Sequence, residues 1–153
     1  MIPKTIHYCW FGGNPLTAEA KACIDSWQRY CPDYEILEWN ESNFDVTQNI
    51  YCLEAYEAKK WAFVSDYARL WLVYEHGGIY MDTDVEVIRS LDSLLGHHLF
   101  MGFENDYSVS IGTFGAEKRN STVGAFLSIY DARHFRQSDG SFDMTTNLRL
   151  VTD

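Results

Sequence analysis

Two aspartates separated by one residue, Asp82 and Asp84, are the sharpest local chemical feature of the sequence. They follow the apolar triplet Ile79-Tyr80-Met81, which predicts a short strand that ends at the pair. Residues two apart in an extended segment point to the same side, so both carboxylates can face one cation. Hard oxygen ligands suit Mg²⁺ or Mn²⁺, with phosphate oxygens and water filling the octahedron. The alternative is a solvated turn in which aspartate serves as a turn former.

A second pair, Asp66 and Arg69, lies within the otherwise apolar stretch WAFVSDYARLWLVY at residues 61–74. The spacing of three places both side chains on one face of a helix. Charged groups among so many aromatic residues are expected to be paired or to bind a ligand. One alternative is an ion pair internal to the helix. The other is a sugar site, because carboxylates accept hydrogen bonds from hydroxyls and a guanidinium donates to hydroxyls or phosphate.

The third constellation is HYCWFGG at residues 7–13, where an apolar segment meets two glycines. Trp10 offers a flat face for a nucleotide base, and the glycines let the backbone approach a ligand closely. Taken alone, a core tryptophan before a turn explains the same residues, and His7 is typical of a hydrogen-bonded core histidine.

These residues need elements to position them, and the pattern predicts strands that alternate with helices. Capping by Thr17, the glycine pair after His76 and the apolar periodicity set the helix limits. The predicted helices are 17–30, 53–75 with a break near Lys60, and 122–133; the predicted strands are 2–10, 34–39, 79–81 continuing extended through 85–88, 99–103 and 108–114. This order predicts an α/β fold with a largely parallel sheet, and ligands in such sheets bind beyond the carboxyl ends of the strands.

Composition excludes several other classes of protein. The 153 residues are 46% hydrophobic and 16% aromatic with three prolines, which is typical of one folded domain and not of a disordered chain. Twenty-two acids against 12 bases give a net charge of −10, which disfavours a nucleic-acid partner. The four cysteines lack zinc-ligand spacing and read as free thiols. No secretory signal or membrane span is recognisable, so we expect a cytoplasmic protein.

Two strings together, IPKTIHYCWFGG and WAFVSDYARLWLVYEHGGIYMDTDVEVI, resemble the D-x-D sugar-transferase family. That family includes initiating mannosyltransferases of yeasts and bacterial capsule and lipopolysaccharide glycosyltransferases, with the glucosylating domains of clostridial toxins as distant relatives. The resemblance implies a GT-A fold, with residues 1–153 forming a single donor-binding domain. It also implies a metal-dependent transfer, with retention, of a sugar from a UDP- or GDP-linked donor to a glycan or lipid-linked acceptor, as in surface polysaccharide synthesis.

The resemblance also implies roles for individual residues around the donor sugar. Asp66 and Arg69 would hold the sugar hydroxyls, with Ser65 nearby and Tyr80 in the same pocket. Asp82 would contact the ribose or the sugar and the shell of the metal ion. These residues, together with Asp84 as the direct metal ligand, would carry the catalysis.

The base end of the donor site is implied in the same way. Trp10 would stack on the nucleotide base, Cys9 would line that site through its backbone, and Trp61 would add an apolar wall. The cofactors implied are Mn²⁺ or Mg²⁺ and the nucleotide-sugar itself. Peripheral association with the inner face of the membrane would bring a lipid-linked acceptor within reach, while the oligomeric state is left open.

One departure from the family pattern keeps alternatives open. Family members are expected to run about a hundred residues further, so the sequence reads as a domain that is truncated at its C-terminus. A nucleotide-sugar-binding fragment or pseudoenzyme with little turnover is therefore the alternative to an active transferase. An acidic interaction domain is a third hypothesis, and a glycoside hydrolase using Asp66 and Asp84 as paired carboxylates is a further one that the neighbouring sequence does not favour.

Overall fold

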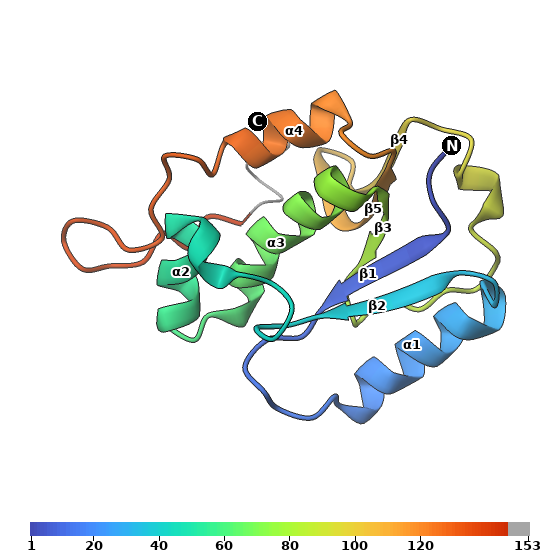
Figure 1. Cartoon of the computed structure of the whole chain (residues 1–153), viewed down its shortest axis with the longest axis horizontal. Coiled ribbons are helices and arrows are strands. Elements are labelled where there is room, and N and C mark those ends of the chain that lie inside the picture. Colours follow the sequence, from blue (N-terminus) through green and yellow to red (C-terminus); the bar gives the residue numbers. More distant parts are fainter. Residues whose placement is uncertain (147–153) are drawn as a thin grey trace.

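The computed structural model describes residues 1–146, in which a five-stranded sheet carries helices on both faces (Figure 1). The strand order is β2-β1-β3-β5-β4. The strands are β1 (Thr5–Cys9), β2 (Glu35–Trp39), β3 (Gly78–Met81), β4 (Leu99–Asn105) and β5 (Ser108–Ala116). The helices are α1 (Ala18–Tyr30), α2 (Ile50–Glu57), α3 (Trp61–His76) and α4 (Ser121–Ser128), with 3-10 turns at Val46–Gln48 and Asp92–Leu94. The predicted α/β architecture is confirmed.

Each face of the sheet has its own apolar core, because successive side chains of a strand point in opposite directions. On β3, Ile79 and Met81 face the layer that contains α1, while Tyr80 faces the layer built from α2, α3 and α4. Figure 1 shows α1 alone on one face and α2, α3 and α4 on the other. The helix α3 that carries Asp66 and Arg69 therefore packs directly on the strands that lead to Asp82.

The helix limits follow local capping chemistry. The Thr17 hydroxyl accepts a hydrogen bond from the Ala20 amide at 3.1 Å, which starts α1 where the sequence predicts. Gly77, with a φ of 68°, ends α3, and its amide N–H donates a hydrogen bond to the Val73 carbonyl. Gly78 also has a positive φ, and a Cβ there would lie 2.8 Å from the Thr5 carbonyl oxygen. Within residues 1–146, none of the helices combines the length and the apolar composition needed to span a membrane.

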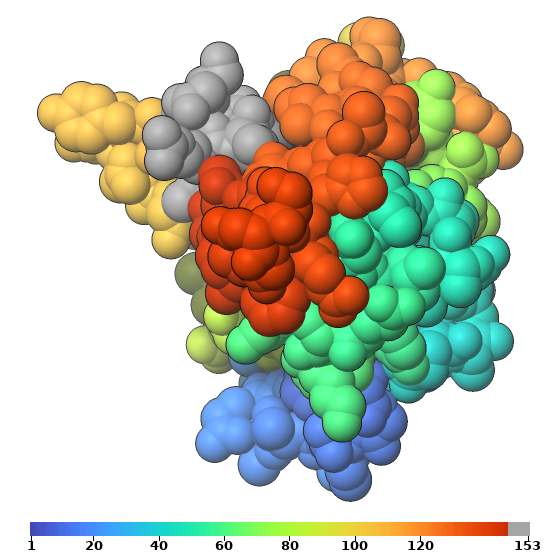
Figure 2. Space-filling model, turned by 90° about the vertical axis from the view of Figure 1, so that its left-hand side faces the viewer, coloured from blue at the N-terminus to red at the C-terminus, as the bar shows by residue number. Residues whose placement is uncertain are grey.

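The sheet is parallel only in its first half. The strands β2, β1 and β3 pair in parallel, whereas β3 with β5 and β5 with β4 pair antiparallel. The sequence predicts a largely parallel sheet. The difference arises because β4 and β5 form a hairpin, and β5, the strand that runs opposite to β3, is the one that pairs with it. The turn of this hairpin projects from the body (Figure 2), and both Phe103 on β4 and Tyr107 on the turn are exposed.

Several predicted elements differ in their limits; the strand predicted over 2–10, for example, is shorter, as β1 (Thr5–Cys9). The break predicted near Lys60 is confirmed, because α2 and α3 are separated at Lys59, which has a positive φ of 57°, but α2 begins at Ile50 and not at Leu53. The helix predicted over 122–133 ends as α4 at Ser128. The extended segment predicted at 85–88 does not join the sheet. Its backbone instead bonds to side chains of α1, with Trp27 donating to the Val85 carbonyl and Ser26 accepting from the Val87 amide.

Candidate functional site

A cleft of about 630 Å³ opens beyond the carboxyl ends of β1 and β3, where the predicted ligand site should lie. It is lined by α3 on one side and by β5 on the other, and its volume suits a ligand of nucleotide size. Every site residue named from the sequence lines it: Cys9, Trp10, Ser65, Asp66, Arg69, Tyr80, Asp82 and Asp84. The three constellations, which are far apart in sequence, thus meet in one cleft. Trp61, the first residue of α3, lines the cleft as well.

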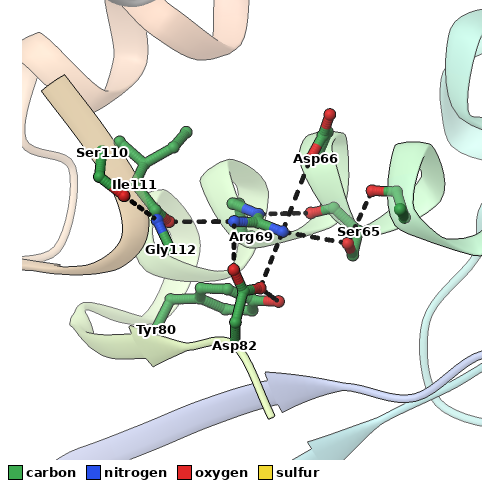
Figure 3. A network of polar contacts seen from close by, with 9 residues as sticks. Ser65, Asp66, Arg69, Tyr80, Asp82, Ser110, Ile111 and Gly112 are labelled. Carbon is green, nitrogen blue, oxygen red and sulfur yellow. Dashed lines mark hydrogen bonds and ion pairs between the residues drawn. The ribbon is translucent and has the colours of Figure 1, made fainter. Parts of the chain in front are cut away.

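Arg69 is the centre of the polar network in the cleft (Figure 3). Its guanidinium ion is buried and pairs with Asp82, with Nη2 lying 3.0 Å from Oδ1 and Nη1 lying 3.4 Å from Oδ2. The same group donates to the Ile111 carbonyl and to both the carbonyl and the hydroxyl of Ser65, each at 3.1 Å. Four hydrogen bonds and the ion pair with Asp82 therefore hold the guanidinium ion on the protein itself.

The partner that the sequence suggested for Arg69 is not its main partner. Asp66 Oδ1 lies 3.6 Å from Arg69 Nη2, which is longer than the 3.0 Å separation from Asp82. Asp66 is nevertheless buried and lines the cleft. The ion pair within the helix exists, but the stronger contact joins α3 to the residue that follows β3. That long-range contact depends on the tertiary fold and has no spacing rule in the sequence.

Asp82 is held from three directions. Besides the two contacts from Arg69, its Oδ1 accepts a hydrogen bond from the Tyr80 hydroxyl at 3.0 Å. Its backbone amide donates to the Gly112 carbonyl on β5 at 2.8 Å. Arg69 also stacks over the Tyr80 ring at 4.6 Å from the centroid. Burial raises the pKa of the Tyr80 hydroxyl well above its ordinary value, so this group stays protonated and donates to the carboxylate.

Asp84 differs from Asp82 in its exposure and its contacts, although both line the cleft. Its side chain is exposed at the rim of the cleft, on a loop outside the sheet. Within residues 1–146, no three histidine, cysteine, aspartate or glutamate side chains come together as a metal-ligand cluster. A cation at this rim would therefore need oxygens from its substrate and from water, as the sequence predicts for Mn²⁺ or Mg²⁺.

The aromatic end of the cleft is built around the first glycine pair. The Trp10 indole N–H donates to the Asn14 carbonyl at 2.8 Å, which fixes the orientation of the half-buried ring. Gly12 has a φ of 98°, and a Cβ there would lie 2.7 Å from the Trp61 ring. The glycine thus lets the loop pass over Trp61, and the cleft keeps an apolar end that can accept a flat ring.

Cys9 and His7 on β1 are not free to act as nucleophile or base. Burial raises the pKa of the Cys9 thiol to about 12, so it stays neutral. His7 is fully buried; its Nδ1 accepts from the Trp39 indole at 3.1 Å, and its Nε2–H donates to the Gly77 carbonyl at 2.9 Å. Burial also lowers the pKa of His7 to about 4. His7 is a structural histidine that ties β1 to the end of β2 and to the turn before β3.

Sequence reasoning missed the contribution of β5 and its hairpin. Ser110, Ile111, Gly112 and Glu104 line the cleft, and two of them act through backbone carbonyls. Every residue has a backbone carbonyl, so contacts made through carbonyls cannot be recognised from the type or spacing of residues in a sequence. The only available signal was the predicted strand itself, whose place beside β3 is decided by the fold.

Residues 17–101 match the family described as the glycosyltransferase sugar-binding region containing the DXD motif. The chain belongs to this family. The matched region includes Asp66, Arg69, Asp82 and Asp84, whereas Trp10 and all of β5 lie outside it.

Related proteins and structures agree with this family. The chain is 30% identical over 124 residues to inositol phosphoceramide mannosyltransferase 3 of Schizosaccharomyces pombe, a match that covers 76% of this chain and 34% of that protein. It is 25% identical to mannosyltransferase 1 of the same series and organism, over 69% of this chain and 37% of the relative. The chain thus spans about a third of the length of these relatives.

Two solved structures share the fold. PaToxG glycosyltransferase superposes with a TM-score of 0.68 at 18% identity, covering 83% of this chain and 58% of that one. A transferase mutant superposes with a TM-score of 0.64 at 10% identity, covering 99% of this chain and 85% of that one. At these identities the likeness shows the fold alone, which is the predicted GT-A glycosyltransferase architecture.

Proposed function

We propose that this chain binds a nucleotide-sugar in the cleft and transfers its sugar to an acceptor hydroxyl with the help of a divalent cation. The observation that carries the proposal is the convergence of the Asp66, Arg69, Asp82 and Asp84 side chains in one cleft with an aromatic end at Trp10. Family membership supports the same reaction, and the cleft offers a place for the base, the diphosphate and the sugar of a UDP- or GDP-linked donor.

The cation fits the cleft at Asp84 better than at Asp82. The Asp82 carboxylate already pairs with Arg69 and accepts a hydrogen bond from Tyr80, so a cation that it coordinated directly would compete with both side chains. The exposed Asp84 carboxylate can coordinate Mn²⁺ or Mg²⁺ while phosphate oxygens and water fill the other positions. When bound, the cation would stabilise the negative charge that develops on the diphosphate leaving group.

The protein side chains then have distinct tasks. Asp82, oriented by Arg69 and Tyr80, accepts hydrogen bonds from ribose or sugar hydroxyls through the lone pairs that the protein leaves exposed. Asp66, which lies on the same face of α3 as Arg69, accepts hydrogen bonds from the sugar hydroxyls. Neither Cys9 nor His7 supplies a nucleophile, since the thiol and the imidazole are buried and neutral. We therefore propose transfer with retention through a front-face route, in which no enzymic nucleophile takes part.

The acceptor is proposed from the relatives. The fungal relatives are named as inositol phosphoceramide mannosyltransferases, so they are described as acting on a lipid-borne sugar alcohol. We propose a glycan or lipid-linked acceptor for this chain, as in capsule or surface polysaccharide synthesis at the inner face of the membrane.

A second candidate function is donor binding with little turnover. It is favoured by the contacts described above, which all concern the donor. Binding and transfer are therefore measured separately.

The test is the thermal stability of the protein with Mn²⁺ and a panel of UDP- and GDP-sugars. A ligand at a hundredfold excess over its Kd stabilises the folded state by about 2.7 kcal/mol, or roughly 5–10 °C in Tm for a chain of this size. We expect such a rise with at least one donor in the presence of Mn²⁺ and its loss in Asp84→Asn.

Glu86→Gln is the matched control, because Glu86 is an exposed carboxylate two residues further along the same loop. It should leave the Mn²⁺-dependent rise unchanged. No rise with any donor in the unmodified protein would refute the donor site, and an unchanged rise in Asp84→Asn would refute the metal role alone. Release of free nucleotide on addition of an acceptor then separates the transferase from the binding module.

A further inference from the structure

The segment Ser110–Gly112 of β5 lies beside the first aspartate of the motif at the cleft (Figure 3). Gly112 is the point of closest approach. Its carbonyl accepts the Asp82 amide at 2.8 Å, and a Cβ built on it would lie 2.9 Å from Asp82 Oδ2. The side-chain space that any other residue would occupy at position 112 is thus already taken by the carboxylate.

A separation of 2.9 Å is shorter than carbon and oxygen normally tolerate, so an added methyl group would displace the carboxylate. A free side-chain end could rotate away easily, but this one is held by Arg69 at both oxygens and by the Tyr80 hydroxyl. Rotation would break those contacts and turn the carboxylate away from its present direction. The glycine is therefore tied to the orientation of Asp82 and not to backbone freedom, because its φ is not in the left-handed region.

The neighbouring residue of β5 fixes the other half of the same ion pair. The Ile111 carbonyl accepts from Arg69 Nη1 at 3.1 Å, and that nitrogen also faces Asp82 Oδ2 at 3.4 Å. Ser110 adds a hydroxyl that accepts from the Gly112 amide at 3.2 Å, which holds this end of the strand in place. Consecutive residues of β5 thus act on Arg69 and on Asp82, which come from α3 and from the end of β3.

We propose that Gly112 is a positioning residue of the donor site, whose missing side chain sets the direction of the Asp82 carboxylate toward a bound nucleotide-sugar. The proposal rests on the proposed function for its ligand, but it concerns a residue outside the region that matches the family. It assigns to β5 a part in donor binding that neither the D-x-D motif nor the helix pair contains.

The first experiment compares Gly112→Ala with Gly102→Ala. Gly102 lies on β4 in the same hairpin, and a Cβ there would meet no atom within 4 Å, so it controls for replacing a strand glycine in this part of the sheet. We expect Gly112→Ala to weaken Mn²⁺-dependent donor binding by about tenfold or more, because turning the carboxylate away removes a charge-assisted hydrogen bond to the donor. Gly102→Ala should bind as the unmodified protein does. Equal binding by both variants would overturn the proposal.

The second experiment needs no ligand and asks whether the effect passes through Asp82. Unfolding by urea is measured for Gly112→Ala, for Asp82→Ala and for the double variant. If the methyl group acts by displacing the carboxylate, Gly112→Ala lowers the urea midpoint in the unmodified background and has no such effect in Asp82→Ala. An equal drop in both backgrounds would show a general defect of β5 and would overturn the positioning role.

The outcomes of the two experiments are separable from those of the proposed function. If Gly112→Ala alone does not fold, restoration of folding by Asp82→Ala supports the proposal, and failure to restore it counts against it. If Asp82→Ala does not fold, the comparison of donor binding by Gly112→Ala and Gly102→Ala decides. Absence of donor binding in the unmodified protein defeats the proposed function, while the urea experiment still tests the link between Gly112 and Asp82.

Discussion

The two halves of the sheet contribute to the cleft in different ways. The parallel half, β2-β1-β3, leads into the residues with functional side chains, because Trp10 follows β1 and Asp82 and Asp84 follow β3. The antiparallel half, β5-β4, contributes mainly backbone groups, through the Ile111 and Gly112 carbonyls. One half thus carries the chemistry, and the other holds it in position.

This division explains why the two aspartates of the motif behave differently. Asp82 lies between the halves, where α3 and β5 can both reach it, and its side chain is 34% exposed. Asp84 is only two residues further along, but the chain has left the sheet and the side chain is exposed. The motif thus provides one positioned carboxylate, Asp82, and one open carboxylate, Asp84.

Arg69 joins the two halves, so its removal should have the largest effect. Arg69→Met keeps the buried volume but leaves Asp82 without its cation and the Ile111 carbonyl without its donor. We expect the free energy of unfolding to fall by about 3 kcal/mol, the lower end of the range for breaking a buried pair. Urea unfolding followed by circular dichroism measures this loss.

Arg119→Met is the control for this variant. Arg119 also stacks on a tyrosine, Tyr74, and also pairs with a carboxylate, Glu75, but its side chain is 57% exposed. Exposed pairs contribute about 0–1 kcal/mol, so this variant should stay close to the unmodified protein. Equal losses in the two variants would mean that the two halves are not joined through Arg69.

The pH dependence of stability at His7 tests the parallel half alone, because His7 bonds to Trp39 and Gly77 there. Its pKa is about 4 in the folded protein because of burial, against 6.5 in an unfolded chain. The contribution of neutral His7 to the free energy of unfolding is fully present above pH 6.5. It is lost as the pH falls from 6.5 to about 4, and no further loss from this group occurs below pH 4. The difference corresponds to roughly 3 kcal/mol at most, since one pKa unit is about 1.4 kcal/mol.

The measurement is the urea midpoint at pH 7 and at pH 4.5. His7→Gln should lose less stability between these pH values than the unmodified protein, although it starts from a lower value at pH 7. His97→Gln, which removes an exposed histidine just before β4, is the control, and it should lose as much stability between these pH values as the unmodified protein does. Parallel pH curves for His7→Gln and the unmodified protein would contradict the assigned protonation.

Gly115 tests the antiparallel half and should show the smallest of the three effects. It pairs with Ile79 on β3 and with Phe100 on β4, and a Cβ there would overlap the Phe100 ring. Gly115→Ala should destabilise the fold by about 1–3 kcal/mol through overpacking. The Tm difference from Gly102→Ala measures it, and a difference near zero would show that β4 and β5 shift to absorb the methyl group.

The sequence predicted the strands of both halves, but not the antiparallel pairing of β5 with β3 and β4. The Thr17 cap, the glycine stop after His76 and the apolar strand before Asp82 are local signals, and each is where it was expected. The segment 85–88 was predicted as extended and lies outside the sheet, because the backbone of this segment forms hydrogen bonds with the side chains of Ser26 and Trp27 on α1. Residues 147–153, where the polar end of the sequence lies, are outside the described residues.

The amino-acid sequence by itself determined which groups could do chemistry: the spacing of two aspartates, the Asp66–Arg69 pair on one helical face, and a tryptophan before two glycines. These depend on periodicity and residue type, which are properties of a short stretch of chain. Only the tertiary structure decided that Arg69 pairs chiefly with Asp82 and that β5 supports both. Those contacts join residues 13 and 42 positions apart, and their partners include backbone carbonyls that every residue shares.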